Sequence, residues 1–522
     1  MKNIKYIAIM TLGLVACEPE LDNSVEDSGT YSSGTADFSK FVTIGNSLTA
    51  GYADGTVYLE GQKNSYPNIL AEKFSFVGGG EFTQPLVNDN IGGLTLGGNQ
   101  IANTRLVLSG NPLGPNYMEG TPTTDVSNIL TGPFNNVGVP GAKSFHLLST
   151  SYGDVSGVLA GTANPYFVRM ASSSSASMLG DAMAQDATFF SLWIGNNDIL
   201  SFATSGGVGV DQTGFYNPAL YGSNDITDPT VFHGVYNDLL NGMTANGAKG
   251  VVMNIPTVTS IPYFTTVPHA PLSPANPAFG PMIPALNAQF GLLNQVFGFL
   301  GYPERAIVFS ETGASAVVIE DDSLTDISTD ITNTILMFDP TFNPGTAYVL
   351  GQLYGQARQA NSNDLPVLTS QTVIGQPNSD AYDYLVGLGV PAADAAQLSI
   401  NGITYPLTDE WVLTETEVDM VITAQTAYNN SIAMLAAAND NVILVDVNAA
   451  MNQLANGGIF YDGGMITSEF VYGGGFSLDG VHPTARGYAV ISNIILDRIN
   501  EEFDATIPAV NPADYPSVYF GD

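Results

Sequence analysis

Four continuous apolar runs, far apart along the chain and separated by helical patterns, restrict the fold more than any other feature. They cover residues 41–47, 187–195, 249–256 and 441–447. A strand that is buried on one face alternates apolar and polar residues, whereas a strand covered on both faces is apolar throughout. Strands of the second kind that alternate with helices predict an α/β fold, with a parallel sheet between two helical layers.

The helical patterns place the rest of that fold. They cover residues 66–74, 175–185, 231–245, 286–300, 417–438 and 484–503. The alternation breaks between about 257 and 415, where Pro, Gly, Thr and Asn are frequent and only scattered strand-like or helical pieces are expected. We therefore predict one folded domain over residues 39–522, with a large insertion or cap at about 257–415.

The N-terminus has the pattern of an export signal. Two lysines precede an apolar run that ends at Cys17, the only cysteine of the chain, and the run is too short to span a bilayer. Residues 14–16 resemble a bacterial lipobox, which predicts that residues 1–16 are a signal peptide and that Cys17 is lipidated. The Ser-, Gly- and acid-rich stretch that follows predicts a flexible tether, so that residues 17–38 are lipidated cysteine and tether.

The charge balance excludes one class of partner. Forty-nine acidic residues face 13 basic ones, which gives a formal net charge of −36. Nucleic acid is excluded because binding its backbone needs clustered Lys and Arg. Strongly anionic polymers are disfavoured for the same reason.

Four short segments lie at or near the ends of predicted strands. They are GNSLTAG at residues 45–51, NVGVPGA at 136–142, GNND at 195–198 and DGVHP at 479–483. In an open parallel sheet, loops at the carboxyl ends of the strands converge on one site. Together and in this order, the segments resemble the four blocks of the SGNH (GDSL-like) serine hydrolase family. The resemblance implies a flavodoxin-like three-layer α/β/α fold.

Three residues of these segments can form a nucleophilic centre. Ser47 lies in a glycine-flanked turn directly after the first strand, and a serine is a poor nucleophile until a base removes its proton. His482 is the natural base, since its ordinary pKa is near neutrality. Asp479, three residues earlier, can accept the other ring N–H and hold the tautomer, as in serine triads.

The resemblance also implies an oxyanion hole. Its donors would be the backbone N–H groups of Ser47 and Gly141 and the side-chain amide of Asn197. The chain departs from the family pattern at Asn46, where Asp is usual. Asp198 is expected to brace its own loop and has no chemical role.

We expect no metal and no cofactor. His146, His233 and His269 lack the paired spacing of metal ligands. The acidic stretch at 321–330 lacks the glycine and the glutamate of a calcium loop, so a solvated loop is expected there.

The function expected from these residues is that of a serine esterase or lipase, which cleaves carboxylic esters through an acyl-enzyme. Lipid or acyl esters are favoured because the insertion contains apolar, aromatic stretches at 261–272 and 289–302. A carbohydrate acetyl esterase and a non-catalytic lipid-binding lipoprotein on the same fold remain as alternatives. The membrane partner would be reached through the lipid anchor, which is typical of an outer-membrane lipoprotein facing the periplasm or the cell surface.

Overall fold

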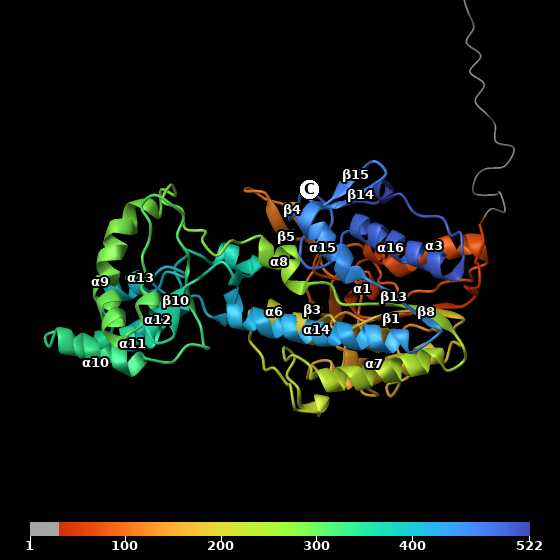
Figure 1. Ribbon diagram of the computed structural model, residues 1–522, viewed down its shortest axis with the longest axis horizontal. Helices are drawn as coiled ribbons and strands as arrows, with labels where there is room; N and C mark the ends of the chain where they lie inside the picture. The colour runs from red at the N-terminus through yellow and green to blue at the C-terminus, as the bar shows by residue number, and fades with distance from the viewer. Residues whose placement is uncertain (1–30, 522) are drawn as a thin grey trace, which may run out of the picture.

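A five-stranded parallel sheet lies at the centre of the computed structural model, which describes residues 31–521 (Figure 1). Its strand order is β13-β8-β7-β1-β6, and all four pairings are parallel. The strands are β1 (Phe41–Gly45), β6 (Asn136–Gly138), β7 (Phe189–Trp193), β8 (Lys249–Met253) and β13 (Val442–Val445). The predicted α/β fold with a parallel sheet is thus confirmed.

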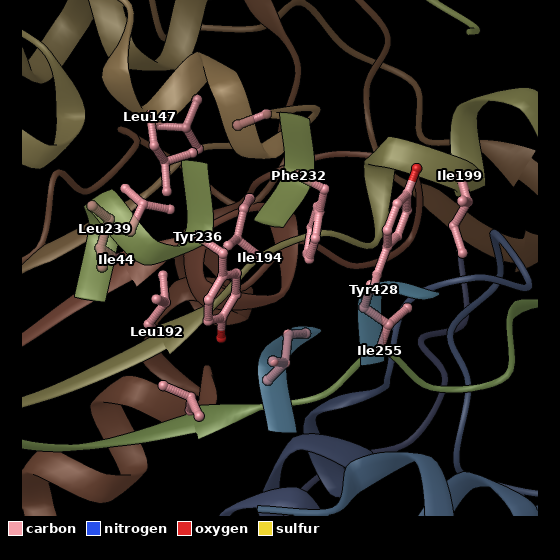
Figure 2. Close-up of a cluster of buried hydrophobic side chains, with 14 of the residues drawn as sticks. Ile44, Leu147, Leu192, Ile194, Ile199, Phe232, Tyr236, Leu239, Ile255 and Tyr428 are labelled. Atoms are coloured by element: carbon pink, nitrogen blue, oxygen red, sulfur yellow. The ribbon is translucent and has the colours of Figure 1, made fainter. Parts of the chain in front are cut away.

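Helices cover both faces of this sheet, and alternate residues of each strand face opposite sides. Phe41 packs with α3 (Tyr66–Phe74) and α16 (Ala485–Phe503), whereas the next residue, Val42, belongs to the core on the other face. That second face is covered by α5 (Met178–Met183), α7 (Pro229–Thr244) and α14 (Glu415–Ala437). Figure 2 shows part of it, where the Phe232 and Tyr428 rings stack with centroids 4.2 Å apart.

Most of the predicted elements are confirmed to within a few residues. The helix expected at 66–74 has those bounds, and the other expected helices correspond to α5, α7, α9 (Ile283–Leu300), α14 and α16. Several short helices were not predicted, and two of them contribute residues to the site described below. These two are α6 (Asn197–Thr204) and α15 (Val447–Gly457).

The inserted segment contains an apolar core of its own. We call residues 266–413 the lobe; Figure 1 shows it projecting to one side of the sheet. The expectation of scattered pieces was wrong, because α9, α10 (Ser328–Phe338) and α11 (Pro344–Tyr354) pack around shared buried side chains. Shorter elements complete the lobe: α12 (Ser379–Gly387), α13 (Ala392–Leu398) and the antiparallel pair β9 (Val318–Glu320) and β10 (Ala357–Gln359).

One acidic residue of the lobe corrects the prediction of a solvated loop at 321–330. Asp321 is buried, and its carboxylate lies 2.7 Å from Nε of Arg358. The same guanidinium binds Asp364 through two nitrogens. The stretch therefore begins with a buried ion pair and ends inside α10.

The two chain connections between the lobe and the body lie close together. The strand β11 (Leu365–Pro366) pairs with β12 (Val412–Leu413), which leads directly into α14. The short helix α8 (Pro262–Thr265), at the entry to the lobe, packs beside β11. The chain thus enters and leaves the lobe close to the same short antiparallel pair.

The folded body begins earlier in the chain than expected, within the range predicted as tether. Phe38 is buried and stacks on Phe74 at 4.1 Å, and Thr35 N–H donates to the Phe503 carbonyl. Residues 32–38 therefore belong to the folded body. The predicted signal peptide, Cys17 and most of the tether lie outside the described residues. Within residues 31–521, no helix has the length and apolar character needed to cross a membrane.

Candidate active site

Ser47 is presented by a tight connection between β1 and the one-turn helix α1 (Ser47–Ala50). Asn46 caps this turn, since its Oδ1 accepts from the Leu48 N–H at 3.0 Å. Gly45 is required before it, because a Cβ there would lie 2.4 Å from the Trp193 carbonyl oxygen. The turn therefore fixes Ser47 at the carboxyl end of the central strand.

The contacts of Asn46 show how the chain accommodates an amide at a position where the SGNH pattern usually has aspartate. Its side chain is completely buried, and its Nδ2 donates to Oδ1 of Asn196 at 3.0 Å. A neutral amide makes this contact without burying a charge. Asn46 therefore joins the Ser47 turn to the segment at 195–198, and none of its hydrogen bonds involves the histidine.

The three predicted catalytic side chains lie in one hydrogen-bonded row. Ser47 Oγ is 2.9 Å from His482 Nε2, and His482 Nδ1 is 2.9 Å from Asp479 Oδ2. The tautomer with its hydrogen on Nδ1 satisfies both contacts, and it leaves Nε2 as the acceptor of the serine proton. This arrangement can activate the hydroxyl for attack on an electrophilic carbon.

Asp479 is held as an ionised carboxylate. Burial favours its neutral form, but the positive charge of His482 and several hydrogen bonds outweigh burial and lower the pKa of Asp479 to about 2. Its Oδ1 accepts from the backbone N–H groups of Val481 and His482, each at 2.8 Å, and its Oδ2 accepts from the Gly55 N–H at 3.0 Å. At neutral pH this fixed negative charge would stabilise an imidazolium at His482.

A second carboxyl group, which the sequence did not reveal, supports the histidine turn. Asp54 is buried, has φ 52°, and accepts from the Leu478 N–H at 3.0 Å and from the Tyr58 hydroxyl at 2.9 Å. Burial, with the nearby charge of Asp479, raises its pKa to about 6. Its only signal in the sequence is a residue type that tolerates positive φ, which many turns share.

The predicted oxyanion donors lie on three separate loops. Within residues 31–521, the backbone N–H groups of Ser47 and Gly141 have no recorded acceptor. Gly141 has φ +77°, and a Cβ there would meet almost nothing. Asn197 Nδ2 donates to the Ala142 carbonyl at 2.9 Å, so one of its two amide hydrogens is already used and the other is left for a ligand.

Asp198 was expected to brace its own loop, but its carboxylate bonds to a different segment, at Ser144. It is completely buried, and its carboxylate accepts from the backbone N–H of Ser144 at 2.8 Å and from the Ser144 hydroxyl at 2.7 Å. Burial raises the pKa of Asp198 despite these hydrogen bonds. Together with the bond between Asn197 and Ala142, this contact ties the Gly141 loop to the start of α6.

An apolar cavity of about 110 Å³ begins at the serine and the histidine. Its walls come from the segment after β8, from α15 and α16, and from the hairpin of β14 (Ile459–Tyr461) and β15 (Gly464–Ile466). His482 is the only ionisable side chain among the residues that line this cavity. The side chains that define its walls include Leu200, Val258, Met451, Leu454, Ile459 and Ile466.

The entry to the lobe touches the histidine turn. Tyr263 N–H donates to the Gly480 carbonyl at 2.9 Å, and the Tyr263 hydroxyl donates to the Thr204 carbonyl at 3.1 Å. A Cβ on Gly480 would lie 2.8 Å from Leu368 of the lobe. The lobe therefore packs over the turn that carries Asp479 and His482.

Among the described residues, no group of three or more His, Cys, Asp or Glu side chains is arranged to hold a metal ion. Comparison of the chain with models of known protein families, with curated proteins and with solved structures gives no match.

Proposed function

We propose that this protein is a serine hydrolase of the SGNH type that cleaves carboxylic esters. The observation that carries the proposal is the row of Ser47, His482 and Asp479, with 2.9 Å between successive partners. A serine within hydrogen-bond reach of a base, and a base oriented by a third group, is the geometry of an activated nucleophile.

The reaction follows from these contacts. Ser47 Oγ forms a bond to the ester carbonyl carbon while its proton passes to His482 Nε2. The bond from that carbon to the alcohol oxygen then breaks, and the imidazolium gives its proton to the leaving alcohol. Water repeats the sequence on the acyl-enzyme, which releases the acid and restores Ser47.

The apolar cavity supports lipid or acyl esters over acetyl esters. An acetyl group is a single methyl beyond the carbonyl and would leave most of this cavity unfilled, whereas a longer acyl chain gains roughly 0.8 kcal/mol for each methylene it buries. With p-nitrophenyl esters we expect the octanoate to exceed the acetate in kcat/KM. A preference for acetate would favour the acetyl esterase instead.

A fluorophosphonate probe tests the catalytic proposal directly, because only an activated serine reacts with it quickly. We expect rapid labelling of the intact protein and none of Ser47→Ala. Ser477→Ala is not a clean control, because the Ser477 hydroxyl contacts Asp479. Ser173→Ala is the matched control, because Ser173 is exposed and its hydroxyl pairs with Ser175 rather than with a member of the row. An unlabelled protein that still binds fatty acids would support the lipid-binding alternative.

We further propose that the protein is an exported lipoprotein anchored through Cys17. The support is the N-terminal pattern alone. Cys17→Ser should release an active protein from the membrane fraction, and unchanged sedimentation with membranes would contradict the anchor.

A further inference from the structure

The lobe contains a cavity of its own, of about 280 Å³. Its walls come from α9, α10, α11 and α13, the helices at the far end of the lobe in Figure 1. None of the residues that line it also lines the apolar cavity at Ser47. An apolar cavity of roughly 150 Å³ is already large enough to hold benzene. The lobe therefore has room for a ligand that does not enter the body.

The floor of the lobe cavity is apolar. It is made by five buried side chains, which are Phe290, Leu293, Ile335, Tyr354 and Leu398. The Tyr354 hydroxyl already donates its hydrogen to the Thr404 carbonyl at 2.6 Å. Such a floor suits a hydrocarbon chain, which gains free energy for each methylene that it removes from water.

The rim of the lobe cavity is polar. Gln289, Asp394 and Gln397 are exposed there, and Thr346 is half-buried. Asp394 takes part in none of the ion pairs formed within residues 31–521. A molecule with its chain on the apolar floor would hold its head group beside this rim, where the Asp394 carboxylate is the only charge of the lining.

The charge of the whole lobe indicates which head group fits. Residues 266–413 contain no lysine and only two arginines. Arg305 is buried and bonded to two backbone carbonyls, and Arg358 is held by the ion pairs described above. An anionic head would meet the Asp394 carboxylate with no free cation to balance it. A cationic head would be attracted to the same carboxylate.

We propose that the lobe cavity binds a single-chain amphiphile with a cationic head, of the alkylammonium kind. The alkyl chain lies on the apolar floor, and the ammonium group lies beside Asp394. The proposal goes beyond the hydrolase function and does not depend on it, because the lobe cavity shares no residue with the row of Ser47, His482 and Asp479.

A blocked cavity identifies binding in the lobe. Thr346→Trp places a large ring at the half-buried rim, and Leu292→Trp does the same from α9. Each should remove one octylammonium site that isothermal titration calorimetry detects in the wild-type protein. Tyr348→Trp is the matched control, because Tyr348 is half exposed on α11 and does not line the cavity. If both blocked variants fold and still bind octylammonium as the wild type does, the ligand is not in the lobe and the proposal is wrong.

Three octyl compounds then test the head group at the site that the blocked variants lack. Octylammonium should bind there about two- to fivefold more tightly than 1-octanol, the size of one exposed ion pair, and octanoate should bind more weakly than octanol. Asp394→Asn should abolish the preference for octylammonium and leave the affinity for octanol unchanged. Asp380→Asn, an equal loss of charge at an exposed position on α12 outside the lining, should keep the preference. If octanol or octanoate binds as tightly as octylammonium to the wild type, the cationic assignment is wrong.

Discussion

The sheet body and the lobe are both built around buried apolar side chains, yet they hold very different chemistry. The body supplies every member of the Ser47, His482 and Asp479 row and every predicted oxyanion donor. The lobe contacts the histidine turn through Leu368, and the entry segment contacts it through Tyr263. Under the proposed function, bond cleavage would belong to the body, whereas the inserted segment would act only through its contacts with the histidine turn.

The largest effect is expected from substitutions in the body alone. Ser47→Ala or His482→Ala should lower ester turnover by about a millionfold, because the row acts as one unit. Circular dichroism and thermal unfolding should stay close to wild type, since neither side chain belongs to an apolar core. Residual turnover within tenfold of wild type would remove the catalytic assignment.

A matched pair of truncations would separate the stability of the two regions. Phe290 of the lobe and Phe232 of the body are both buried and both packed against other rings. Each change to alanine should cost roughly 3–5 kcal/mol of unfolding free energy. We expect Phe232→Ala to slow fluorophosphonate labelling of Ser47 and Phe290→Ala to leave it nearly unchanged. Equal slowing in both would show that body and lobe unfold as one unit.

Asn197→Ala tests the oxyanion hole that we predict in the body. Loss of one donor should lower kcat by about 10²- to 10³-fold with little change in KM, because the amide binds the developing negative charge more strongly than the neutral carbonyl. Steady-state kinetics measures this. Asn246→Ala, on the surface of the body, is the control and should behave like wild type. A rise in KM with constant kcat would assign Asn197 to substrate binding instead.

The smallest effect concerns the junction of body and lobe. Glu417 lies in the first turn of α14, near Asp409 and Asp322. Burial, together with the charges of these two carboxylates, raises the pKa of Glu417 from 4.5 to about 7. The folded state thus prefers the protonated acid, so this stabilisation is present below about pH 4.5 and is lost as pH rises through about 7.

Glu417→Gln keeps the acceptor for the Thr414 N–H and removes the titration. Its melting temperature should therefore fall less between pH 5 and pH 8 than that of wild type. Asp54, with a pKa of about 6, titrates in the same sense and leaves part of the slope in place. Identical slopes in the two proteins would contradict the role of Glu417.

The body was largely predictable because its strands are buried on both faces. Continuous apolar runs such as that of β7 are rare outside such strands, and they place the loops that follow them at one edge of the sheet. The edge strand β6 has only three residues and carries no such run, although the segment that contains it was identified. The sequence motifs alone were enough to predict that Ser47, Asp479 and His482 lie together.

The lobe was less predictable, since its helices alternate with turns and carry many polar residues. The sequence of α10 begins STDITNT, which combines poor helix formers with an apolar face that only the lobe core explains. The ion pair of Asp321 was equally hard to predict, because its partner Arg358 lies 37 residues away in the chain. Asp54 serves the site through backbone contacts with the 477–482 turn, and such pairings between distant segments leave no local pattern.

Leu368 lies against Gly480, although the two positions are 112 residues apart in the chain. The residue types that can occupy one position therefore depend on the residue at the other. Gly480 has φ +72°, which asparagine also tolerates, but a Cβ there would lie 2.8 Å from the Leu368 side chain, which would have to shift, and 3.2 Å from the Tyr263 backbone nitrogen. Among descendants of this chain, position 480 should therefore stay glycine for as long as position 368 keeps a large side chain. A lineage that lost the lobe would lose the closest of these contacts, and asparagine would then be tolerated more readily two residues before His482.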